Sequence, residues 1–540
     1  MTAFSRRRFL YGTAAAAAAG VGAVACGTKQ DEARPVSRDH HSAIVVGSGY
    51  GGGVSALRLG LAGVDTLILE KGRHFDTPDE DGKRFSRMVP PDTRASWFTV
   101  VPPSLVPSFQ GISVADVVRQ VPSPQPVQAG VCENLVFGAH NVFRGVGVGG
   151  GSLINAAIAA VPTPGQLQEA FPDIAPAEFL DTYIPRARDT LRISYRDMDW
   201  FEQTPWFQFA RTGRQYAAAA GYGVDYNGSA YSFDYMLQEE AGTVPRSAFD
   251  LEQQYGNNHG RLGSVDVTYV AAALATGKVT LSPLTEVTGI RREADGEWVV
   301  STRMIDRWGK ELERRELGCD KLFLSAGVLG TNTILMRARE SGGLDDLSEE
   351  IGRGYGNNGD VMVAHHLQDA DPSGTQQSSL GMINLDGRDD PDNPVYASMF
   401  SIPLPVETHT LGYYVMVKTG DRATMSYDAK SDSIDIDWPQ THTDHLVARA
   451  QMVFDKVTQA NGVEYRDDVF DGKVFAPNTV HPLGGCVRGA ATDAFGRVKN
   501  YDNLYVNDAS QLPGYLGCNP FMTITALAER NIEGILQGRT

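Results

Sequence analysis

A histidine in the stretch VHPLGGC, residues 480–486, has the side chain best suited to move a proton near neutral pH. The unperturbed pKa of an imidazole is about 6.5, so a side chain such as His481 can take up or hold a hydroxyl proton. The stretch leaves two interpretations open. It is either a turn in which the histidine is a satisfied core group, or a base held where the glycines let a ligand come close.

An asparagine near the C-terminus, Asn519, has an amide that can donate a hydrogen bond to a substrate oxygen or to the face of a bound ring. Pro520 biases it toward an extended backbone, and Gly517 permits close approach of a ligand. We expect a helix over 521–531, with its positive N-terminal end directed at the same place. A plain helix-start signal is the alternative interpretation of the Asn-Pro pair.

A glutamate, Glu407, lies in the apolar run 401–417, which we expect to form a strand. Apolar surroundings disfavour the charged form of a carboxylate, and such a group suits a proton shuttle. His409 would face the same side of the strand and is a rival candidate, while an exposed loop glutamate is the alternative. The pair His442 and His445 has no third ligand nearby, so we expect solvated surface there and no metal site.

The element that could position a cofactor for these groups lies in residues 42–73. A buried strand leads into G-x-G-x-x-G, a helical pattern follows, and a second strand ends in Glu70. Gly47 suits a tight turn, Gly49 lets the backbone approach a pyrophosphate, and Gly52 lets helix and strand pack closely. The terminal glutamate can accept hydrogen bonds from a ribose diol, which a glycine-rich turn in an unrelated βαβ unit would not explain. The segment predicts dinucleotide binding, and its early position is typical of FAD proteins.

A second glycine-rich run, RGVGVGGGSLINAA at 144–157, is too rich in glycine for regular structure. Its physical use is a close approach of the backbone to a flat or charged ligand. A flexible linker is the alternative, and the apolar residues that flank the run count against it.

The composition allows more than one hydrophobic core. The chain has 540 residues, of which 42% are hydrophobic, and a formal net charge of −17. No basic run that could face a nucleic acid occurs after the extreme N-terminus, so we expect no nucleic-acid partner, and the acidity indicates solubility. Five cysteines are present without metal-binding spacing, and the sequence leaves their pairing open.

The N-terminus predicts an export signal over 1–26. The order SRRRFL before an alanine-rich apolar stretch is typical of a signal read by the twin-arginine translocase, with an ordinary secretory signal as the alternative. The letters AVAC admit a signal-peptidase site before Cys26 or a lipobox that acylates Cys26. Residues 27–38 are polar and indicate a tether. We therefore expect a secreted or cell-surface protein, with a lipid anchor at Cys26 as one form of it.

Taken together, these segments resemble those of the glucose–methanol–choline flavoprotein oxidoreductases. The matching stretches run in order along the chain: GSGYGGGVSALRL, RASWF, RGVGVGGGSLIN, YGNNHG, TYVAAALATGKVT, HPLGGC and GCNPFMTITALAERN. In detail the chain resembles the branch of bacterial cholesterol oxidases that hold FAD non-covalently. The resemblance implies non-covalent FAD, a sterol substrate such as cholesterol, molecular oxygen as electron acceptor, and transient contact with a membrane surface.

The resemblance also implies cofactor contacts residue by residue. The ADP-binding motif falls on Gly47, Gly49, Tyr50, Gly51, Gly52 and Glu70, and the glycine loop along the flavin falls on Gly151, Asn155, Ala156 and Ile158. A backbone contact to adenine falls on Val287, and a pair beside the ribityl chain and pyrophosphate falls on Asp508 and Ala509. The two residues at the flavin ring are Asn519 and Phe521. The chain reads Asn-Ala-Ala-Ile at 155–158 where the family usually reads Asn-Gly-Gly-Met, and Ala509 replaces a usual glycine.

Three positions match catalytic residues of the family. His481 falls on the histidine near the steroid hydroxyl, Asn519 on the asparagine that contacts flavin and substrate, and Glu407 on the carboxylate that acts on the steroid double bond. The resemblance implies oxidation of the 3β-hydroxyl of cholesterol with O2 to give H2O2, and isomerisation of the 5-ene to the 4-en-3-one. The alternatives are a related flavin alcohol or steroid dehydrogenase with another acceptor, and a non-catalytic flavin-binding surface lipoprotein.

The expected fold class is α/β, with a Rossmann-like FAD-binding domain and an α+β substrate domain roofed by a large sheet. The FAD-binding domain is expected to be discontinuous and to comprise 39–74, 263–354 and 496–540. The steroid-binding domain is expected to comprise the inserts 75–262 and 355–495.

Overall fold

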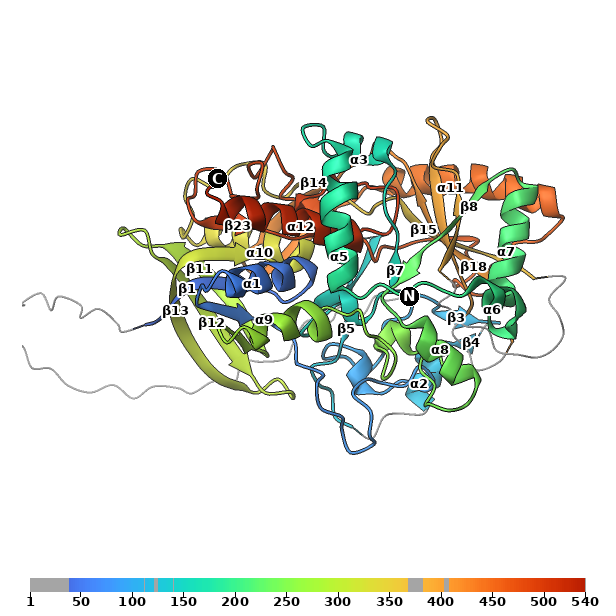
Figure 1. Cartoon of the computed structure of the whole chain (residues 1–540), viewed down its shortest axis with the longest axis horizontal. Coiled ribbons are helices and arrows are strands. Elements are labelled where there is room, and N and C mark those ends of the chain that lie inside the picture. Colours follow the sequence, from blue (N-terminus) through green and yellow to red (C-terminus); the bar gives the residue numbers. More distant parts are fainter. Residues whose placement is uncertain are drawn as a thin grey trace, which may run out of the picture. The chain divides into compact units, whose positions relative to one another are not determined.

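The computed structural model describes residues 38–110, 112–120, 125–138, 140–367, 382–402 and 407–539. The predicted signal peptide, Cys26 and residues 27–37 of the predicted tether lie outside them. The described chain from Asp39 onward forms one unit with two large sheets and covering helices (Figure 1). None of its described helices combines the length and the apolar composition that a bilayer crossing requires.

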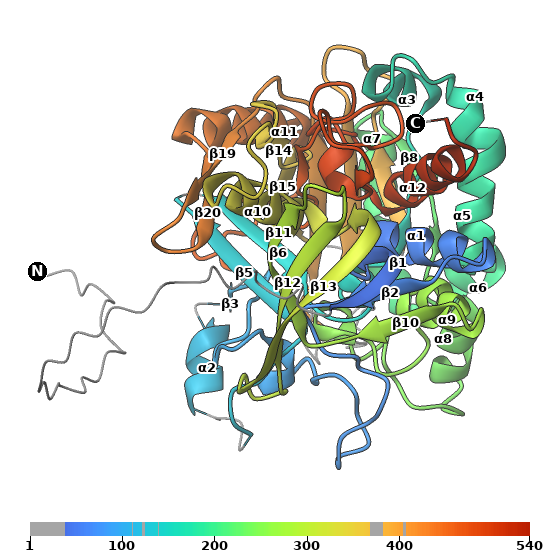
Figure 2. The ribbon, with the colours of Figure 1, turned by 90° about the vertical axis from the view of Figure 1, so that its left-hand side faces the viewer.

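The first large sheet has seven strands in the described part of the chain and is built around the predicted βαβ unit (Figure 2). In spatial order the strands are β10 (Val279–Ser282), β2 (Thr66–Leu69), β1 (Asp39–Val46), β13 (Glu311–Leu324), β12 (Trp298–Ile305) and β11 (Thr285–Arg292), with β23 (Leu504–Val506) paired to β13. β10, β2, β1, β13 and β23 run parallel, whereas β12 and β11 are antiparallel to their neighbours. Because β13 is 14 residues long, its beginning pairs with β12 and its end with β1 and β23.

The parallel strands are followed by helices that start at the same edge of the sheet. Residues 43–46 of β1 are buried without interruption, as expected of a parallel strand covered on both faces. α1 (Tyr50–Leu61) follows β1, and α10 (Gly327–Glu340) follows β13. α1 packs against α12 (Phe521–Leu536), where Arg58 Nε lies 2.7 Å from Oε2 of the buried Glu529. The strand–turn–helix pattern therefore occurs twice, which places two helix N-termini side by side.

The second large sheet, with six strands among the described residues, is antiparallel throughout. In spatial order it comprises β21 (Phe475–Pro477), β15 (Asp360–His366), β18 (Thr410–Val417), β17 (Val395–Phe400), β16 (Ile383–Asp386) and β8 (Gly223–Tyr226). One face of it is covered by α7 (Gln208–Ala219) and α11 (Gln440–Asn461) (Figure 1). His365 Nε2 lies 2.9 Å from the Thr458 hydroxyl of α11, and a Cβ on Gly213 of α7 would meet Met399 and Leu411.

Alternation along these strands sends a second set of side chains to the opposite, inward face. Asn384, Ser398, Tyr414 and Met362 are cross-strand neighbours in one row over β16, β17, β18 and β15. Asp360 lies two positions before Met362 and therefore shares its face. A row of polar groups thus lies on the sheet face that is turned away from α7 and α11.

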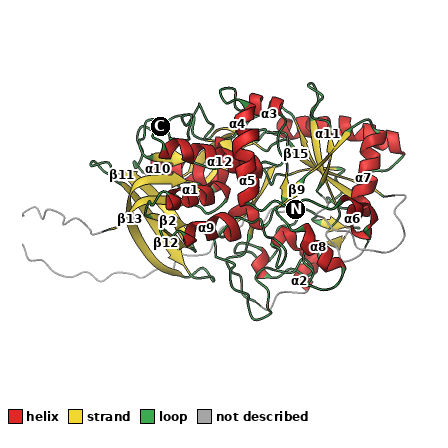
Figure 3. Cartoon of the chain, viewed as in Figure 1, coloured by secondary structure: helices red, strands yellow, loops and turns green. Residues whose placement is uncertain are grey.

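The other described elements are shorter (Figure 3). The helices are α2 (Val114–Gln120), α3 (Pro164–Ala170), α4 (Pro176–Glu178), α5 (Ile184–Thr190), α6 (Met198–Gln203), α8 (Phe233–Glu240) and α9 (Ala271–Ala275). The strands pair as β3 (Ser108–Phe109) with β4 (Ile112–Ser113), β5 (Cys132–Phe137) with β6 (His140–Gly145), β7 (Ile158–Ala159) with β9 (Gly228–Ser229), β14 (Arg353–Gly356) with β22 (Leu483–Gly485), and β19 (Thr424–Asp428) with β20 (Ser433–Asp437).

The strands of the two large sheets fall into different predicted domains. Every strand of the seven-stranded sheet lies in the segments predicted for FAD binding, and every strand of the six-stranded sheet lies in the inserts between them. The chain from Asp39 onward nevertheless groups as one unit by contact, so the domain boundaries stay a prediction.

The four described cysteines form no disulfide. Cys132, Cys319, Cys486 and Cys518 are free and buried. Burial raises the pKa of the Cys132, Cys319 and Cys518 thiols to about 12.

Candidate active site

The glycines of the predicted dinucleotide motif have different surroundings. Gly47 has φ +95°, and a Cβ there would lie 2.3 Å from the Ser325 carbonyl oxygen. A Cβ on Gly52 would lie 2.0 Å from the Gly47 carbonyl oxygen, so α1 begins in close contact with the turn before it. Gly49 is open, since the first atom its Cβ would meet is the Gly150 Cα at 3.9 Å. Close packing therefore requires glycine at 47 and 52, whereas Gly49 leaves room for a ligand.

The second glycine-rich run faces the first. Gly150 has φ +56°, and a Cβ on it would lie 3.0 Å from the Gly49 Cα. At Gly151 a Cβ would meet nothing within 4 Å, whereas at Gly51 it would lie 1.6 Å from the Asn507 carbonyl oxygen. The open backbone at Gly49 and Gly151 and the N-terminus of α1 form what we call the cradle. Its backbone N–H groups and open space fit the pyrophosphate and flat ring of a dinucleotide.

The carboxylate of Glu70 lies directly after β2 at this cradle. Its Oε2 accepts hydrogen bonds from the Ser48 backbone N–H at 3.0 Å and from the Ser48 hydroxyl at 2.6 Å, and its Oε1 accepts one from Gly72 N–H at 2.8 Å. Burial raises the pKa of Glu70, and these three hydrogen bonds oppose the rise. A carboxylate oxygen can accept two hydrogen bonds, so Oε1 has a second acceptor position available for a ribose hydroxyl.

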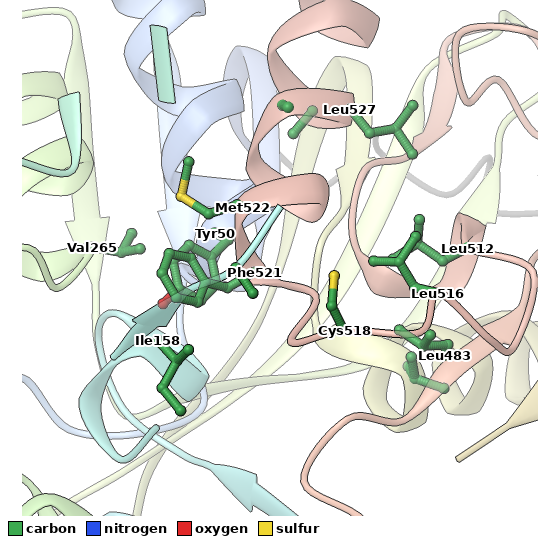
Figure 4. Close-up of a cluster of buried hydrophobic side chains, with 14 of the residues drawn as sticks. Tyr50, Ile158, Val265, Leu483, Leu512, Leu516, Cys518, Phe521, Met522 and Leu527 are labelled. Carbon is green, nitrogen blue, oxygen red and sulfur yellow. The ribbon is translucent and has the colours of Figure 1, made fainter. Parts of the chain in front are cut away.

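Two aromatic rings connect the cradle with the start of α12. The Tyr50 ring stacks on Phe521, with ring centroids 5.1 Å apart and an interplanar angle of 12° (Figure 4). The Tyr50 hydroxyl accepts a hydrogen bond from Asn155 Nδ2 at 2.7 Å, and the buried Arg261 donates to Asn155 Oδ1 at 3.0 Å and to the Ser152 carbonyl. The sequence interpretation missed Arg261. Its signal was an arginine directly after YGNNHG, one of the matching stretches.

The remaining predicted cofactor residues lie around the same place. Asp508 Oδ2 accepts hydrogen bonds from Gly327 N–H at 2.9 Å and from the Thr331 hydroxyl at 2.6 Å, which fixes the start of α10 to the end of β23. Burial raises the pKa of Asp508. Ala509 begins a short 3₁₀ turn, Val287 lies at a bulge in β11, Ala156 is exposed and Ile158 is buried in β7 (Figure 4).

The predicted base His481 lies between a carboxylate and an amide. Its Nδ1 is 3.0 Å from Asp360 Oδ1, and its Nε2 is 3.4 Å from Asn519 Nδ2. The side chain is 11% exposed, and the edge of its ring meets Tyr414 with centroids 5.5 Å apart. The structure therefore brings two of the three predicted catalytic residues together.

The Asn519 amide has its nitrogen on the side of His481. Its Oδ1 accepts a hydrogen bond from the Ser398 hydroxyl at 3.2 Å, and its Nδ2 lies 3.4 Å from His481 Nε2. An NH2 group can only donate, so Nε2 is the acceptor and the imidazole proton is on Nδ1, facing Asp360. Nε2 therefore presents a lone pair beside an amide donor, which is the arrangement needed to receive a hydroxyl proton.

The glycines after His481 serve close packing of the protein on itself. Gly484 has φ +88°, and a Cβ on it would lie 2.2 Å from the Gly354 carbonyl oxygen of β14. Gly485 has φ +91°, and a Cβ on it would lie 2.3 Å from Asn332 Nδ2 of α10. The interpretation of these two glycines as room for a ligand is wrong, because β14 and α10 fill that space.

The third predicted catalytic residue, Glu407, is placed differently. It is half-buried and lies before β18, where its Oε1 accepts a hydrogen bond from the His409 backbone N–H at 2.8 Å. β18 spans only Thr410–Val417, so the expectation of a strand over the whole of 401–417 is wrong. The left-handed φ of +46° at His409 interrupts the extended chain there. Among the described residues no hydrogen bond or ion pair joins Glu407 to His481 or Asn519.

Apolar side chains and a cavity lie beyond Tyr414. Val480, next to His481, packs against a buried cluster that comprises Val106, Met362, Ala364, Ile402, Tyr414, Val469 and Phe470. A cavity of about 580 Å³ lies between segment 97–107 and β21, and its lining includes Asn478 and Phe143. The Tyr414 hydroxyl lies 3.2 Å from Asn478 Oδ1, so one tyrosine separates the cavity lining from the His481 ring.

The comparisons first indicate the class of protein. Residues 358–471, which include Asp360, Ser398 and Tyr414, match the family model described as GMC oxidoreductase, C-terminal. The fold is shared with the solved structures of a pyridoxine 4-oxidase from Mesorbium loti and a fungal aryl-alcohol oxidase, at TM-scores of 0.60 and 0.59 and identities of 18% and 13%. These matches cover 92% and 93% of this chain and 99% and 100% of the two structures. The predicted α/β fold is confirmed.

Curated relatives match along almost the whole chain. Cholesterol oxidase of Mycobacterium tuberculosis is 24% identical, and the match covers 91% of this chain and 90% of the relative. Cholesterol oxidase of Acinetobacter baumannii is 23% identical, with 91% of this chain and 94% of the relative covered. These matches and the family model show that the chain is similar to oxidoreductases of the GMC family.

Proposed function

We propose that the protein is a FAD-dependent oxidase of the 3β-hydroxyl of cholesterol or a related sterol, with O2 as acceptor and H2O2 as product. One observation carries the proposal: His481 Nε2, an acceptor, and Asn519 Nδ2, a donor, lie 3.4 Å apart and can share one substrate oxygen. FAD held non-covalently in the cradle supplies the acceptor for the hydride on the alcohol carbon.

The two side chains have complementary roles. His481 Nε2 receives the hydroxyl proton, while the Asn519 amide donates to the same oxygen and holds the alcohol carbon in a fixed orientation. Asn519 precedes α12, whose N-terminal end favours negative charge at this place. At the cradle, Tyr50, Asn155 and Gly151 would hold the flavin ring.

Two observations support a sterol among the possible alcohols. The curated relatives that match most of the chain are named cholesterol oxidases. The buried apolar cluster beside Val480 and Tyr414 offers a hydrophobic surface next to the proton-accepting nitrogen.

Anaerobic titration of the purified holoprotein tests the proposal. Cholesterol in detergent micelles should bleach the flavin absorbance, and admission of air should restore it with release of H2O2. If bleaching occurs and only an added dye restores the colour, the protein is a dehydrogenase with another acceptor. If neither sterols nor simple alcohols bleach the flavin, the non-catalytic surface lipoprotein is the correct alternative.

We further propose that Glu407 moves a proton from carbon 4 to carbon 6 of the oxidised steroid. Glu407→Gln should leave flavin reduction within about twofold of wild type and release the 5-en-3-one in place of the 4-en-3-one, because an amide cannot shuttle the proton. Chromatography of the products checks this, with the exposed Glu464→Gln as the matched control. Unchanged 4-en-3-one output from Glu407→Gln contradicts the role.

Export by the twin-arginine translocase, a secreted or cell-surface location and transient membrane contact also belong to the proposal. Export and the location are supported by SRRRFL and the alanine-rich stretch after it, and the membrane contact follows from a sterol substrate. Mass spectrometry of the mature N-terminus separates cleavage before Cys26 from acylation of Cys26.

A further inference from the structure

Asp360 is a buried carboxylate beside His481 that takes no part in the proton and hydride transfers described above. It begins β15, its side chain is fully buried, and its one ion-pair partner among the described residues is His481. A buried carboxylate is costly unless several donors satisfy it. Asp360 has three of them: His481 Nδ1 at 3.0 Å from Oδ1, and the hydroxyls of Thr479 and Tyr414 at 2.6 and 3.1 Å from Oδ2.

The two hydroxyls also hold the backbone that carries the histidine. The Thr479 hydroxyl accepts a hydrogen bond from the His481 backbone N–H at 2.9 Å, and the Tyr414 hydroxyl accepts one from Val480 N–H at 2.9 Å. Burial and the nearby negative charge of Asp360 raise the pKa of Tyr414 far above its usual range, so its hydroxyl stays a donor. One carboxylate thereby fixes the ring of His481 directly and its backbone through two intermediaries.

We propose that Asp360 is the positioning residue of this site: it holds the imidazole proton on Nδ1, so that Nε2 faces the substrate as the proton acceptor. This inference rests on the proposed alcohol oxidation. In that reaction the O–H proton goes to His481 Nε2 as the ketone forms, and the C–H bond would break with its electron pair so that FAD held in the cradle would supply the hydride acceptor. The hydride and this proton together balance the reduction of O2 to H2O2.

The carboxylate has two effects on this step. It excludes the other neutral tautomer, because a carboxylate can only accept at Nδ1. It also lies next to the positive charge that the imidazole gains when Nε2 takes the proton, and so stabilises that charge in a largely buried site. Both effects require the negative charge and not merely a side chain of this shape.

Asp360→Asn separates charge from shape. The hydroxyls of Thr479 and Tyr414 direct their hydrogens at the Oδ2 position, so the amide oxygen is expected there and the NH2 group faces Nδ1. Nδ1 must then accept, the proton moves to Nε2, and the lone pair for the substrate is lost. We expect the limiting rate of anaerobic flavin reduction to fall by about 100-fold or more, with KM changed less than threefold.

The pH profile of flavin reduction distinguishes positioning from a structural role. Asp360→Asn removes the negative charge beside the imidazole, so the pH dependence of flavin reduction should differ between this variant and wild type. Glu239→Gln is the matched control, because Glu239 is equally buried and is held by Tyr231 and backbone N–H groups outside the site. It should change thermal stability without moving the pH profile.

A spectroscopic measurement on wild type reports the tautomer of His481 without a change at Asp360. In ¹⁵N-histidine-labelled holoprotein, with His481 assigned by its loss in His481→Gln, Nδ1 should show the shift of a protonated nitrogen and Nε2 that of an unprotonated one. The reverse assignment overturns the inference, and so does an Asp360→Asn holoprotein that keeps the wild-type rate and pH profile. Loss of reduction in His481→Ala with a normal Asp360→Asn leaves the proposed function standing, whereas no bleaching of wild type by any alcohol removes the proposed function itself.

Discussion

The nucleotide cradle and the histidine centre are built in opposite ways. The cradle takes Gly49 and the N-terminus of α1 from one continuous strand–helix–strand segment, which also contains Gly47, Gly52 and Glu70, and adds Gly151 from the second glycine-rich run. The histidine centre joins His481 and Asn519 from loops with Asp360 and Ser398 from two strands of the other sheet. In the cradle the conformation and packing of the backbone determine which residues are required. In the histidine centre the cross-strand register brings together side chains that have no fixed spacing in the chain.

The largest expected effect tests whether the cradle depends on backbone packing. A methyl group on Gly52 would lie 2.0 Å from the Gly47 carbonyl oxygen, and neither backbone can move without breaking the β1–α1 turn. Gly52→Ala should therefore lower the free energy of unfolding by about 3 kcal/mol or more, measured by urea denaturation of the apoprotein.

Gly49→Ala is the matched control for that change. Its methyl group would have 3.9 Å to the first protein atom, so the fold should keep wild-type stability while the affinity for FAD falls by at least about tenfold. Equal stability of the two variants would contradict the assignment of one glycine to packing and the other to the ligand.

The next effect tests the histidine centre. His481→Ala removes the group that accepts the hydroxyl proton, and the rate of anaerobic flavin reduction by substrate should fall by about 100-fold or more. FAD content, read from the absorbance spectrum, should stay that of wild type because no cradle contact changes. A nearly normal rate would make His481 a satisfied core group, the alternative that its sequence left open.

The smallest effect sharpens the comparison at one hydroxyl. Ser398→Ala removes the donor to Asn519 Oδ1, so the amide is free to turn its oxygen toward His481. We expect flavin reduction to slow by about three- to tenfold, as for loss of one neutral hydrogen bond of roughly 1 kcal/mol. The cross-strand neighbour Asn384→Ala is the control, and an equal loss in both variants would mean that the sheet, and not the amide, is being perturbed.

The two regions also differ in what the sequence predicts. The strand, the turn and the helix at the cradle were predictable because each glycine of the motif is required by the backbone close to it in the sequence. The position of Glu70 was predictable because it comes directly after the second strand of the motif. For His481 and Asn519 the residue types left a structural alternative open, and the resemblance to the glucose–methanol–choline flavoproteins implied the catalytic roles. Asp360 and Ser398 carried no local signal, since their contact with the centre depends on β15 and β17 sharing one face of a sheet.

The wrong expectations have the same physical origin. An apolar run predicts a strand, but a left-handed residue at His409 cuts it short. Histidine adopts this conformation more often than most residues other than glycine, but its presence in a sequence does not by itself predict it. Gly484 and Gly485 look like room for a ligand until β14 and α10 occupy the space beside them. Local sequence patterns predict the conformation of the nearby backbone well, but they do not predict which distant segment packs against it.

The four described cysteines are buried and unpaired, so the described fold does not depend on a disulfide bond. Because these four cysteines form no disulfide, the described part of the chain needs no oxidant to complete its covalent structure. The thiols are also poor targets for oxidation, because burial keeps Cys132, Cys319 and Cys518 protonated at neutral pH and out of contact with solvent. Under the proposed function, the same burial would protect these thiols from the hydrogen peroxide that the reaction releases.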